Sequence, residues 1–359
     1  MKEQVQVMID WIEKRLKEPF SLDELAAYMG YSPYYCSFTF HRLTGMSMRR
    51  YVLLRRLYLS TYELSLNRKI IDVAFAYNYS SQEAYSRAFK KIFGLTPKEY
   101  QRQRVPVQST VKLTFHQNGA DNYMDVSKKL EVTKVQEDYK ELFDQEVLHI
   151  LNGQMMYEEF KEQKLMGASI YAPFNEAMCV NETSEHPFGE TFIHLRANGH
   201  GENAEKYTDK VIAPLEPFFS AKHQCIVLWF GEDLFCQMNL LTLLAYLEQT
   251  NFEGKVFLHS FREDEFKVNQ VELTLGHYDT TYQEVLVQHQ EPTHTLIPVM
   301  YQAVHLYLDM LKEENQVVRY IKQNQNLTSK ELVKQLLSLF PAIGYGDTQY
   351  LQLIEKVRS

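Results

Sequence analysis

Apolar side chains recur at helical spacing in the stretch 81–93, and polar side chains fill the positions between them. The apolar positions, three or four residues apart, are Ala84, Tyr85, Ala88, Phe89, Ile92 and Phe93. The opposite face carries hydrogen-bonding and charged side chains, namely Gln82, Glu83, Ser86, Arg87, Lys90 and Lys91. Ser81 can cap such a helix and Gly94 can end it. The pattern predicts an amphipathic helix that packs on one side and presents a largely basic face on the other.

An earlier stretch of the chain repeats this arrangement. Residues 25–47 and 73–97 each read as a helix, a tight turn and a second helix, and Gly30 and Asn78 fall where the turns need positive φ. The matched pairs include Ser37 with Ser86, Phe40 with Phe89, Arg42 with Lys91 and Gly45 with Gly94. The repeat predicts two helix-turn-helix units, joined by a long helix over about residues 47–66.

Further residues accompany the repeat at fixed spacing. They are Trp11-Ile12, Leu22-x-x-Leu25-Ala26, Gly30-Tyr31-Ser32, Ile71, Val73-Ala74, the run from Ser86 to Lys91, and Gly94-x-x-Pro97-x-x-Tyr100. Over about residues 4–104 these features resemble the DNA-binding domain of the AraC/XylS family of bacterial transcription regulators. The resemblance implies an all-α double helix-turn-helix domain, assigned to residues 1–105, whose two reading helices enter successive major grooves of promoter DNA. It also implies RNA polymerase as a partner and a cytoplasmic location.

The resemblance also implies which residues contact DNA. Carried over by position, they are Tyr34, Ser37 and Phe38 in the first unit and Gln82, Glu83, Ser86 and Arg87 in the second, with Lys90 and Lys91 placed to meet phosphates. One position departs from the pattern, because Phe38 stands where the second copy has Arg87. Arg87 can bond a guanine, whereas we expect the first helix to read thymine methyl groups or DNA shape. The alternative is that Arg87 pairs with Glu83 on an ordinary surface helix.

Charge is divided unevenly along the chain. The 359 residues carry a formal net charge of −8. Residues 1–105 hold 17 Lys and Arg against 10 Asp and Glu, a net of +7, whereas the remaining residues carry a net of −15. A basic amino-terminal third on an acidic chain favours contact with phosphates by that part alone.

The next segment, residues 106–146, reads as a connector. Val105-Pro106 breaks the preceding helix, and the alternating pattern of residues 107–115 predicts a short strand. The rest of the connector contains a turn-rich stretch and a stretch of mixed charge with helical spacing. The sequence leaves open whether the connector is an ordered part of the second domain or a mobile arm.

From Val147 onward, short apolar runs alternate with helical patterns. The runs cover residues 147–151, 168–172, 225–230 and 256–259. Fully apolar runs of this length indicate a parallel sheet covered on both faces, so we predict an α/β domain over residues 147–292. Beyond Thr293 the pattern is helical, and we expect residues 293–359 to pack with the α/β domain.

Polar residues gather where the predicted strands end. They are His149 and Asn152 at the first strand, Asn175 and Glu176 after the second, and Trp229 and Glu232 at the third. Because ligands bind at the carboxyl ends of strands in open α/β sheets, these six residues form a candidate effector pocket. The alternative is that His149 is a core histidine with a satisfied hydrogen bond and Glu232 is an acidic residue favoured at a helix amino terminus.

Four segments of this half carry a second resemblance. They are His149-Ile150-x-Asn152-Gly153, the stretch from Pro173 to Cys179, the strand from Val227 to Asp233 with Gln237 and Leu240, and Gly344-x-Gly346-Asp347-Thr348-Gln349. They resemble an uncharacterised bacterial family, the domain-of-unknown-function family 1835, loosely over residues 147–357. That resemblance implies no activity.

Patterns that signal catalysis or metal binding are absent from the sequence. It has no Gly-rich phosphate loop, no His-Glu-x-x-His and no Gly-x-Ser-x-Gly. His194 and His200 come nearest to a pair of metal ligands, but we expect no metal site, no catalytic residue and no cofactor. The cysteines show no metal spacing and are expected to be reduced and mostly buried: Cys36, Cys179, Cys225 and Cys236. No apolar run is long enough to predict a membrane span.

The sequence therefore predicts a multidomain bacterial transcription regulator. An all-α double helix-turn-helix domain binds DNA, and an α/β domain with a helical carboxyl-terminal segment senses a small-molecule effector or mediates assembly. Two alternatives remain open: a regulator fused to an enzyme-like α/β domain, and a constitutive DNA-binding protein with a protein-interaction domain. No motif identifies the operator, the effector, the sign of regulation or the oligomeric state.

Overall fold

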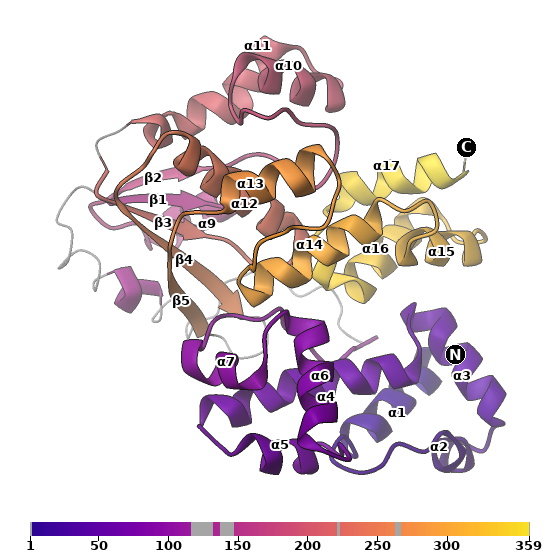
Figure 1. Ribbon diagram of the computed structural model, residues 1–359. Helices are drawn as coiled ribbons and strands as arrows, with labels where there is room; N and C mark the ends of the chain where they lie inside the picture. Colours follow the sequence, from indigo (N-terminus) through magenta and orange to yellow (C-terminus); the bar gives the residue numbers. More distant parts are fainter. Residues whose placement is uncertain (1, 116–131, 137–146, 221–222, 263–266, 359) are drawn as a thin grey trace. The chain divides into compact units, whose positions relative to one another are not determined.

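The computed structural model describes residues 2–115, 132–136, 147–220, 223–262 and 267–358 (Figure 1). Contacts between residues divide the chain into two compact units. The helical unit comprises residues 1–121 and 309–359, and the α/β unit comprises residues 122–308. Within the described ranges, no helix combines the length and the apolar character needed to cross a membrane.

The amino-terminal part of the helical unit is built entirely of helices. They are α1 (Lys2–Glu13), α2 (Leu22–Met29), α3 (Pro33–Thr44), α4 (Met48–Ser65), α5 (Ile70–Ala76), α6 (Gln82–Phe93) and α7 (Pro97–Gln103). The pairs α2–α3 and α5–α6 are the two helix-turn-helix units predicted from the repeat, and α4 connects them. Gly30 and Asn78 occupy the two turns with φ of 70° and 63°, as the repeat requires. The predicted all-α arrangement is confirmed.

Matching caps give α3 and α6 the same length. Ser32 and Ser81 each accept a hydrogen bond from the backbone amide three residues further on, which satisfies an amide of the first turn. Gly45 and Gly94 end the helices in the left-handed conformation, with φ of 71° and 79°. Each helix therefore spans 12 residues between equivalent signals.

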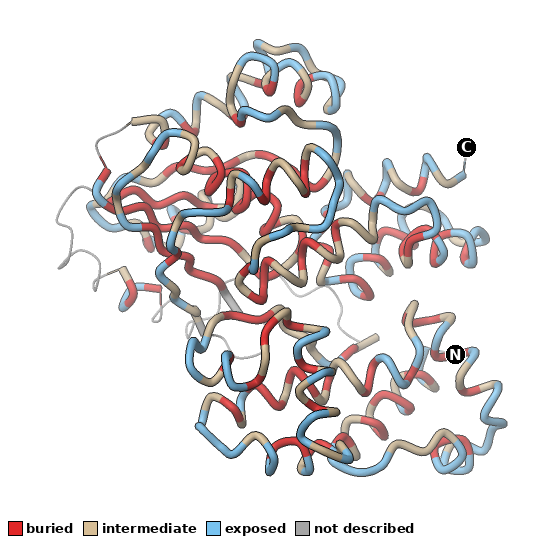
Figure 2. Tube along the Cα trace, in the orientation of Figure 1, coloured by how far each residue is buried: buried red, intermediate tan, exposed pale blue. Residues whose placement is uncertain are grey.

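Each helix-turn-helix unit has its own hydrophobic core. Phe40 lies in the first core and Phe89 in the second, and both side chains are fully buried. Arg55 on α4 donates two hydrogen bonds of 2.8 Å to the carboxylate of Glu13 on α1, which joins the connecting helix to the first core. Figure 2 shows buried and exposed positions alternating along these helices.

Residues 105–115 have no regular secondary structure, so the strand predicted there is wrong. Val107 packs into the second core and Leu113 into the first. The alternating pattern therefore reflects side chains that enter helical cores, because side chains of any extended chain alternate whether or not it joins a sheet. Of the predicted connector 106–146, residues 116–131 and 137–146 lie outside the described residues.

Residues 309–359 group with the helical unit, whereas the sequence analysis placed residues 293–359 with the α/β domain. Helix α14 (Pro298–Met310) spans the boundary, and α15 (Gln316–Gln323), α16 (Ser329–Leu339) and α17 (Asp347–Arg358) follow. A Cβ atom built on Gly45 would lie 2.9 Å from the ring of Phe340, and Gln108 donates to the Ala342 carbonyl at 3.2 Å. An amphipathic pattern shows which face of a helix is buried, but it does not show what covers that face.

The α/β unit contains a five-stranded sheet in the order β2-β1-β3-β4-β5. The strands are β1 (Val147–Leu151), β2 (Ile170–Pro173), β3 (Cys225–Trp229), β4 (Lys255–Arg262) and β5 (Lys267–Leu273). The four strands predicted from apolar runs are parallel, and β5 is an antiparallel edge strand that the sequence analysis missed. Helices and turns that follow the strands are α9 (Gln154–Glu162), α10 (Glu190–Gly199), α11 (Ala204–Tyr207), α12 (Leu234–Gln249) and α13 (Tyr278–Tyr282).

Both faces of the sheet are covered, as predicted. Val147, Val227 and Trp229 share one face with Phe160 of α9 and with Val132, the first residue of a short described helical stretch. Ile226 points to the opposite face, because side chains alternate along a strand, and it is buried as well. Helix α12 is buried on nearly every side and packs against α13.

Candidate nucleic-acid interface

Helix α6 separates an apolar face from a polar face. Tyr85, Phe89 and Phe93 are buried, and the Tyr85 hydroxyl shares a 2.7 Å hydrogen bond with Ser60 of α4, which orients the helix. The predicted contact residues lie on the other side: Gln82, Glu83, Arg87, Lys90 and Lys91 are exposed, and Ser86 is half-buried. The structure therefore brings the six predicted residues of the second unit to one helix and leaves them accessible.

Arg87 is not held by Glu83. Hydrogen bonds from the backbone amide of Glu83 and from the Ser81 hydroxyl lower the pKa of the Glu83 carboxyl, with a smaller effect of the Arg87 charge. Among the ion pairs of the described residues, none joins Arg87 to Glu83. Groups in the first turn of α6 thus act on the Glu83 carboxyl more strongly than Arg87 does.

Helix α3 exposes aromatic side chains at positions where α6 exposes charged side chains. Tyr34 is 79% exposed and Phe38 is 52% exposed, and Ser37 between them is half-buried. The same helix buries Cys36 and Phe40 in the first core. All three predicted contact residues of the first unit thus lie outside the core.

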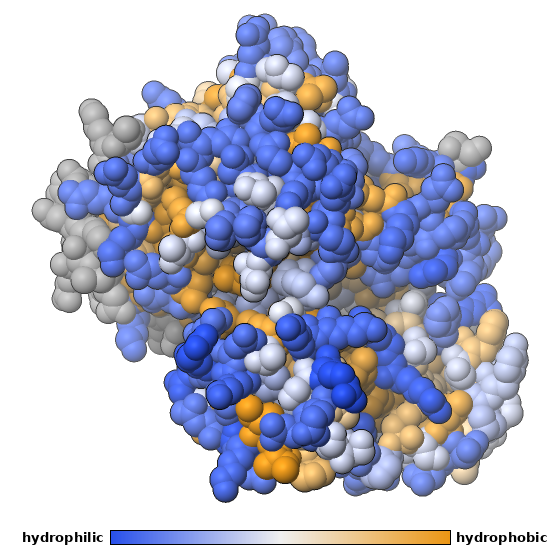
Figure 3. Space-filling model, in the orientation of Figure 1, coloured by the Kyte–Doolittle hydropathy of each residue, from blue (hydrophilic) through white to orange (hydrophobic). Residues whose placement is uncertain are grey.

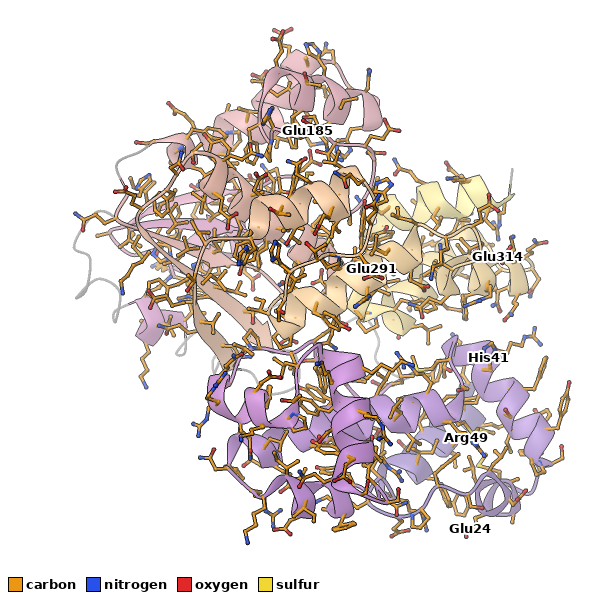
Figure 4. All side chains as sticks on the ribbon, viewed as in Figure 1. Glu24, His41, Arg49, Glu185, Glu291 and Glu314 are labelled. Atoms are coloured by element: carbon orange, nitrogen blue, oxygen red, sulfur yellow. The ribbon has the colours of Figure 1, made fainter. Side chains whose placement is uncertain are left out.

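Other polar residues border the two helices. His41 on α3 and Arg49 at the start of α4, both labelled in Figure 4, are exposed. Hydrophilic residues cover most of the visible face of the helical unit in Figure 3, with a small hydrophobic patch over α5. Helix α5 exposes Ile71 and Phe75.

Two of the six candidate pocket residues in the α/β unit contact each other in its core. Trp229 donates a 2.9 Å hydrogen bond from Nε1 to Nδ1 of His149, and both side chains are buried. His149 also stacks on Tyr171, with ring centroids 4.5 Å apart. Burial lowers the pKa of His149 to about 3, so the ring is neutral near pH 7 and its Nδ1 can accept the bond. This arrangement matches the alternative of a core histidine with a satisfied hydrogen bond.

Glu176 lies at the centre of a buried polar cluster. Its carboxylate accepts hydrogen bonds from Arg196 at 2.8 and 3.3 Å, shares one of 2.7 Å with His200 Nε2, and accepts another from the Tyr207 hydroxyl. Arg196 also donates to the carbonyl groups of Ala177, Val180, Asn181 and Glu182. Burial opposes ionisation of Glu176, but the charge of Arg196 and the bonds from His200 and Arg196 outweigh it and hold the pKa well below its usual range. The cluster joins the loop after β2 to α10.

Asn152, after β1, belongs to a second set of polar contacts. Its Nδ2 donates to Cys236 Sγ at 2.9 Å, and its Oδ1 accepts from Asn239 Nδ2 at 3.0 Å. Asn239 also donates to the backbone carbonyl of Glu176 at 2.7 Å, which links Asn152 to that loop. Asn239 was not predicted, although a polar residue in the largely apolar helix α12 was a usable signal.

The remaining two pocket candidates, Asn175 and Glu232, lie in the loops that follow β2 and β3. Asn175 donates to the Lys210 carbonyl at 3.0 Å and to Gln154 at 3.4 Å, and its Oδ1 is buried without a hydrogen-bond partner. Glu232 is buried in the turn between β3 and α12. The Oδ1 of Asn175 is therefore a buried acceptor that remains available for a ligand.

The side chains that could bind a metal or act as nucleophiles are mostly engaged or buried in the described part of the chain. In the described part of the chain, no three His, Cys, Asp or Glu side chains are grouped so that they could hold a metal ion. His200, one of the two histidines considered as ligands, bonds Glu176 instead. All four cysteines are free and buried, and burial raises the pKa of Cys225 to about 12. A thiol with so high a pKa is a poor nucleophile near pH 7.

Known proteins match the amino-terminal part of the chain. A family model described as a helix-turn-helix domain matches residues 25–103. The regulatory protein SoxS of Salmonella typhimurium is 34% identical over 100 residues, which cover 28% of this chain and 94% of SoxS. The chain belongs to the AraC/XylS family. The solved structure of a Chromobacterium violaceum transcriptional regulator, described as AraC-type, matches at 26% identity with a TM-score of 0.27, over 28% of this chain and 92% of that one.

The matches to this AraC/XylS family member cover less than a third of its chain. The right origin-binding protein of Escherichia coli is 41% identical over 96 residues, which are 26% of this chain and 33% of that protein. The chain thus spans about a third of the length of this relative. The resemblance of residues 147–357 to the domain-of-unknown-function family 1835 stays a prediction.

Proposed function

We propose that this protein is a sequence-specific DNA-binding transcription regulator. The observation that carries the proposal is the polar face of α6, where Gln82, Arg87 and Lys91 are exposed while the opposite face is buried. Arg and Gln are the side chains that read guanine and adenine in the major groove, and Lys neutralises phosphates. The net charge of +7 over residues 1–105 supports contact with the duplex. The proposed partners are promoter DNA and RNA polymerase, and the proposed location is the cytoplasm.

Salt dependence of binding tests the proposal. Neutralising about five phosphates should give a slope of log K against log salt of about −4 to −5 for the whole chain on a selected duplex. The measurement is a titration by fluorescence anisotropy at several salt concentrations. A slope near zero, or no duplex enriched from a random pool, would contradict the proposal.

Arg87 and Lys91 are expected to act differently on the duplex. Arg87→Ala should relax preference at one base pair, because a two-pronged bond to guanine discriminates by about 1–3 kcal/mol. Lys91→Ala should weaken all sequences alike and make the salt slope shallower by about one. Binding-site selection with both variants measures this. If Arg87→Ala selects the same motif with the same information content as the parent, Arg87 does not read a base.

We further propose that the α/β unit senses a small ligand or mediates assembly. In the sheet, β2 pairs with one side of β1 and β3 pairs with the other side. The direction in which successive strands are added therefore reverses at the point between β1 and β3. Ligands of open α/β sheets bind beside such a point, at the carboxyl ends of the strands. Asn152 follows β1, Glu232 follows β3, and Asn175 offers an unused Oδ1. These features support a polar ligand site there.

Asn175→Ala is the variant that tests ligand sensing. It should alter the response of a reporter promoter while leaving the DNA affinity of the purified, ligand-free protein unchanged, because Asn175 lies in the other unit. Lys206→Ala, at an exposed position of the same unit, is the matched control. A normal response in Asn175→Ala, Asn152→Ala and Glu232→Gln alike would place control elsewhere. A protein whose α/β unit only assembles would show no ligand-dependent rise in melting temperature, and a fused enzyme would show turnover.

A further inference from the structure

The two reading helices are built alike but present different chemistry. Helices α3 and α6 each span 12 residues between a serine cap and a left-handed glycine, so residues at equal distance from the cap correspond. Phe38 corresponds to Arg87, and Tyr34 corresponds to Glu83. If both helices enter the major groove, as the proposed function requires, an aromatic pair in one meets the bases where charged residues do so in the other.

The aromatic pair of α3 forms one accessible aromatic surface. The rings of Tyr34 and Phe38 are stacked, with centroids 6.1 Å apart and planes inclined by 11°. Residues four apart lie on the same side of a helix, and these two rings are 79% and 52% exposed. An apolar surface that a folded domain leaves accessible commonly marks a binding site.

The chemistry of this surface limits what it can recognise in DNA. A phenyl ring has no hydrogen-bonding group, so Phe38 cannot make the two-pronged bond to guanine that is open to Arg87. The basic residues of α3, His41 and Arg42, lie in its last turn. Among the base edges of the major groove, the group that apolar side chains recognise is the C5 methyl of thymine.

We propose that α3 recognises thymine through its methyl group, with Tyr34 and Phe38 as the specificity-determining residues. The inference rests on the proposed function and adds the base class that the first unit selects. The pair lies at the helix positions that in α6 carry the exposed charged residues Glu83 and Arg87, which favours DNA over a protein as its partner. The second unit selects by hydrogen bonds and the first by apolar contact.

Replacing thymine by uracil tests the inference, because deoxyuridine lacks only the methyl group. The whole chain is titrated with a duplex obtained by binding-site selection, in which each thymine is replaced in turn. Selection with Arg87→Ala identifies the half of the site that α6 reads, and the other half belongs to α3. We expect about a fourfold loss of affinity for each contacted methyl in the α3 half. In the α6 half we expect no comparable loss.

Substitutions of Phe38 test whether the loss of affinity for the uracil duplex depends on the aromatic pair. Phe38→Ala should keep its melting temperature, since the ring is largely exposed, and should bind the thymine and uracil duplexes equally. Phe38→Arg should shift selection in the α3 half towards guanine. Phe75→Ala, at an exposed phenylalanine on α5, is the matched control and should retain the parent's sensitivity to uracil.

Two results would overturn the inference while leaving the proposed function intact. One is a uracil scan that is flat in both halves of a selected site. The other is a Phe38→Ala variant that keeps the parent's uracil sensitivity, as expected if the pair instead packs against a protein. If no duplex is selected from a random pool, the proposed function fails and the inference fails with it.

Discussion

Replacing Arg196 by Met is expected to destabilise the α/β unit by about 3–5 kcal/mol, because it leaves the Glu176 carboxylate buried without its cation. The side chains of Arg196 and Glu176 are both 0% exposed, so water cannot take over the lost hydrogen bonds. Four backbone carbonyl groups that Arg196 now bonds would also lose a donor.

The chain offers a selective reporter for this experiment. It has two tryptophans, Trp11 in the helical unit and Trp229 on β3. In a Trp11→Phe background, urea denaturation followed by tryptophan fluorescence therefore reports the α/β unit. Lys206→Ala is the matched control, since the side chain is 67% exposed and its ion pair should contribute at most about 1 kcal/mol. Equal midpoints for Arg196→Met and Lys206→Ala would show that the buried pair contributes no stability.

Acid should remove part of the same stabilisation. The pKa of Glu176 is lower in the folded protein than in the unfolded chain, where it is about 4.3. The unfolded chain therefore takes up a proton first as the pH falls, and the contribution of Glu176 is complete above about pH 4.3 and declines below it. Arg196→Met should flatten this decline. An acid profile identical to the parent's would contradict the assigned role of the pair.

Phe89→Ala should cost the helical unit about 3–5 kcal/mol, because it empties a fully buried position of the second helix-turn-helix core. Trp11, in a Trp229→Phe background, reports this unit during denaturation. Phe75→Ala makes the same substitution at a side chain that is 56% exposed and should change stability by about 0.5 kcal/mol or less. If Phe89→Ala kept the parent's melting temperature and weakened only DNA binding, the assignment of the faces of α6 would be wrong.

The helical unit was largely predictable because its signals are local. A serine cap, a run of apolar positions at helical spacing and a terminal glycine act within one helix, and the repeat gives each of them twice. Ser81 and Gly94 take the predicted roles, and Ser32 and Gly45 take the same roles in the first copy. The prediction of a strand at residues 107–115 was wrong because an alternating pattern in one segment does not show whether a second strand pairs with it. Val107 and Leu113 enter helical cores.

The strands of the sheet were predictable where the chain contains a short apolar run. The apolar runs of β1 and β3 identify them directly, since every residue of each is buried. Strand β5 was missed because its sequence, KVNQVEL, mixes polar and apolar residues, and its place depends on antiparallel pairing with β4. A strand that mixes polar and apolar residues gives no apolar run from which it could be predicted.

The sequence by itself determined the double helix-turn-helix, the family and the residues expected to face DNA, because each rests on short-range spacing. Only the tertiary structure decided what the polar residues of the α/β unit do. Glu176 had been chosen for a pocket, but Arg196, twenty positions away, brings its guanidinium to the carboxylate. Likewise His149 meets Trp229 across neighbouring strands. Whether a buried polar group is free for a ligand depends on partners that are distant in sequence, and these come together only when the chain folds.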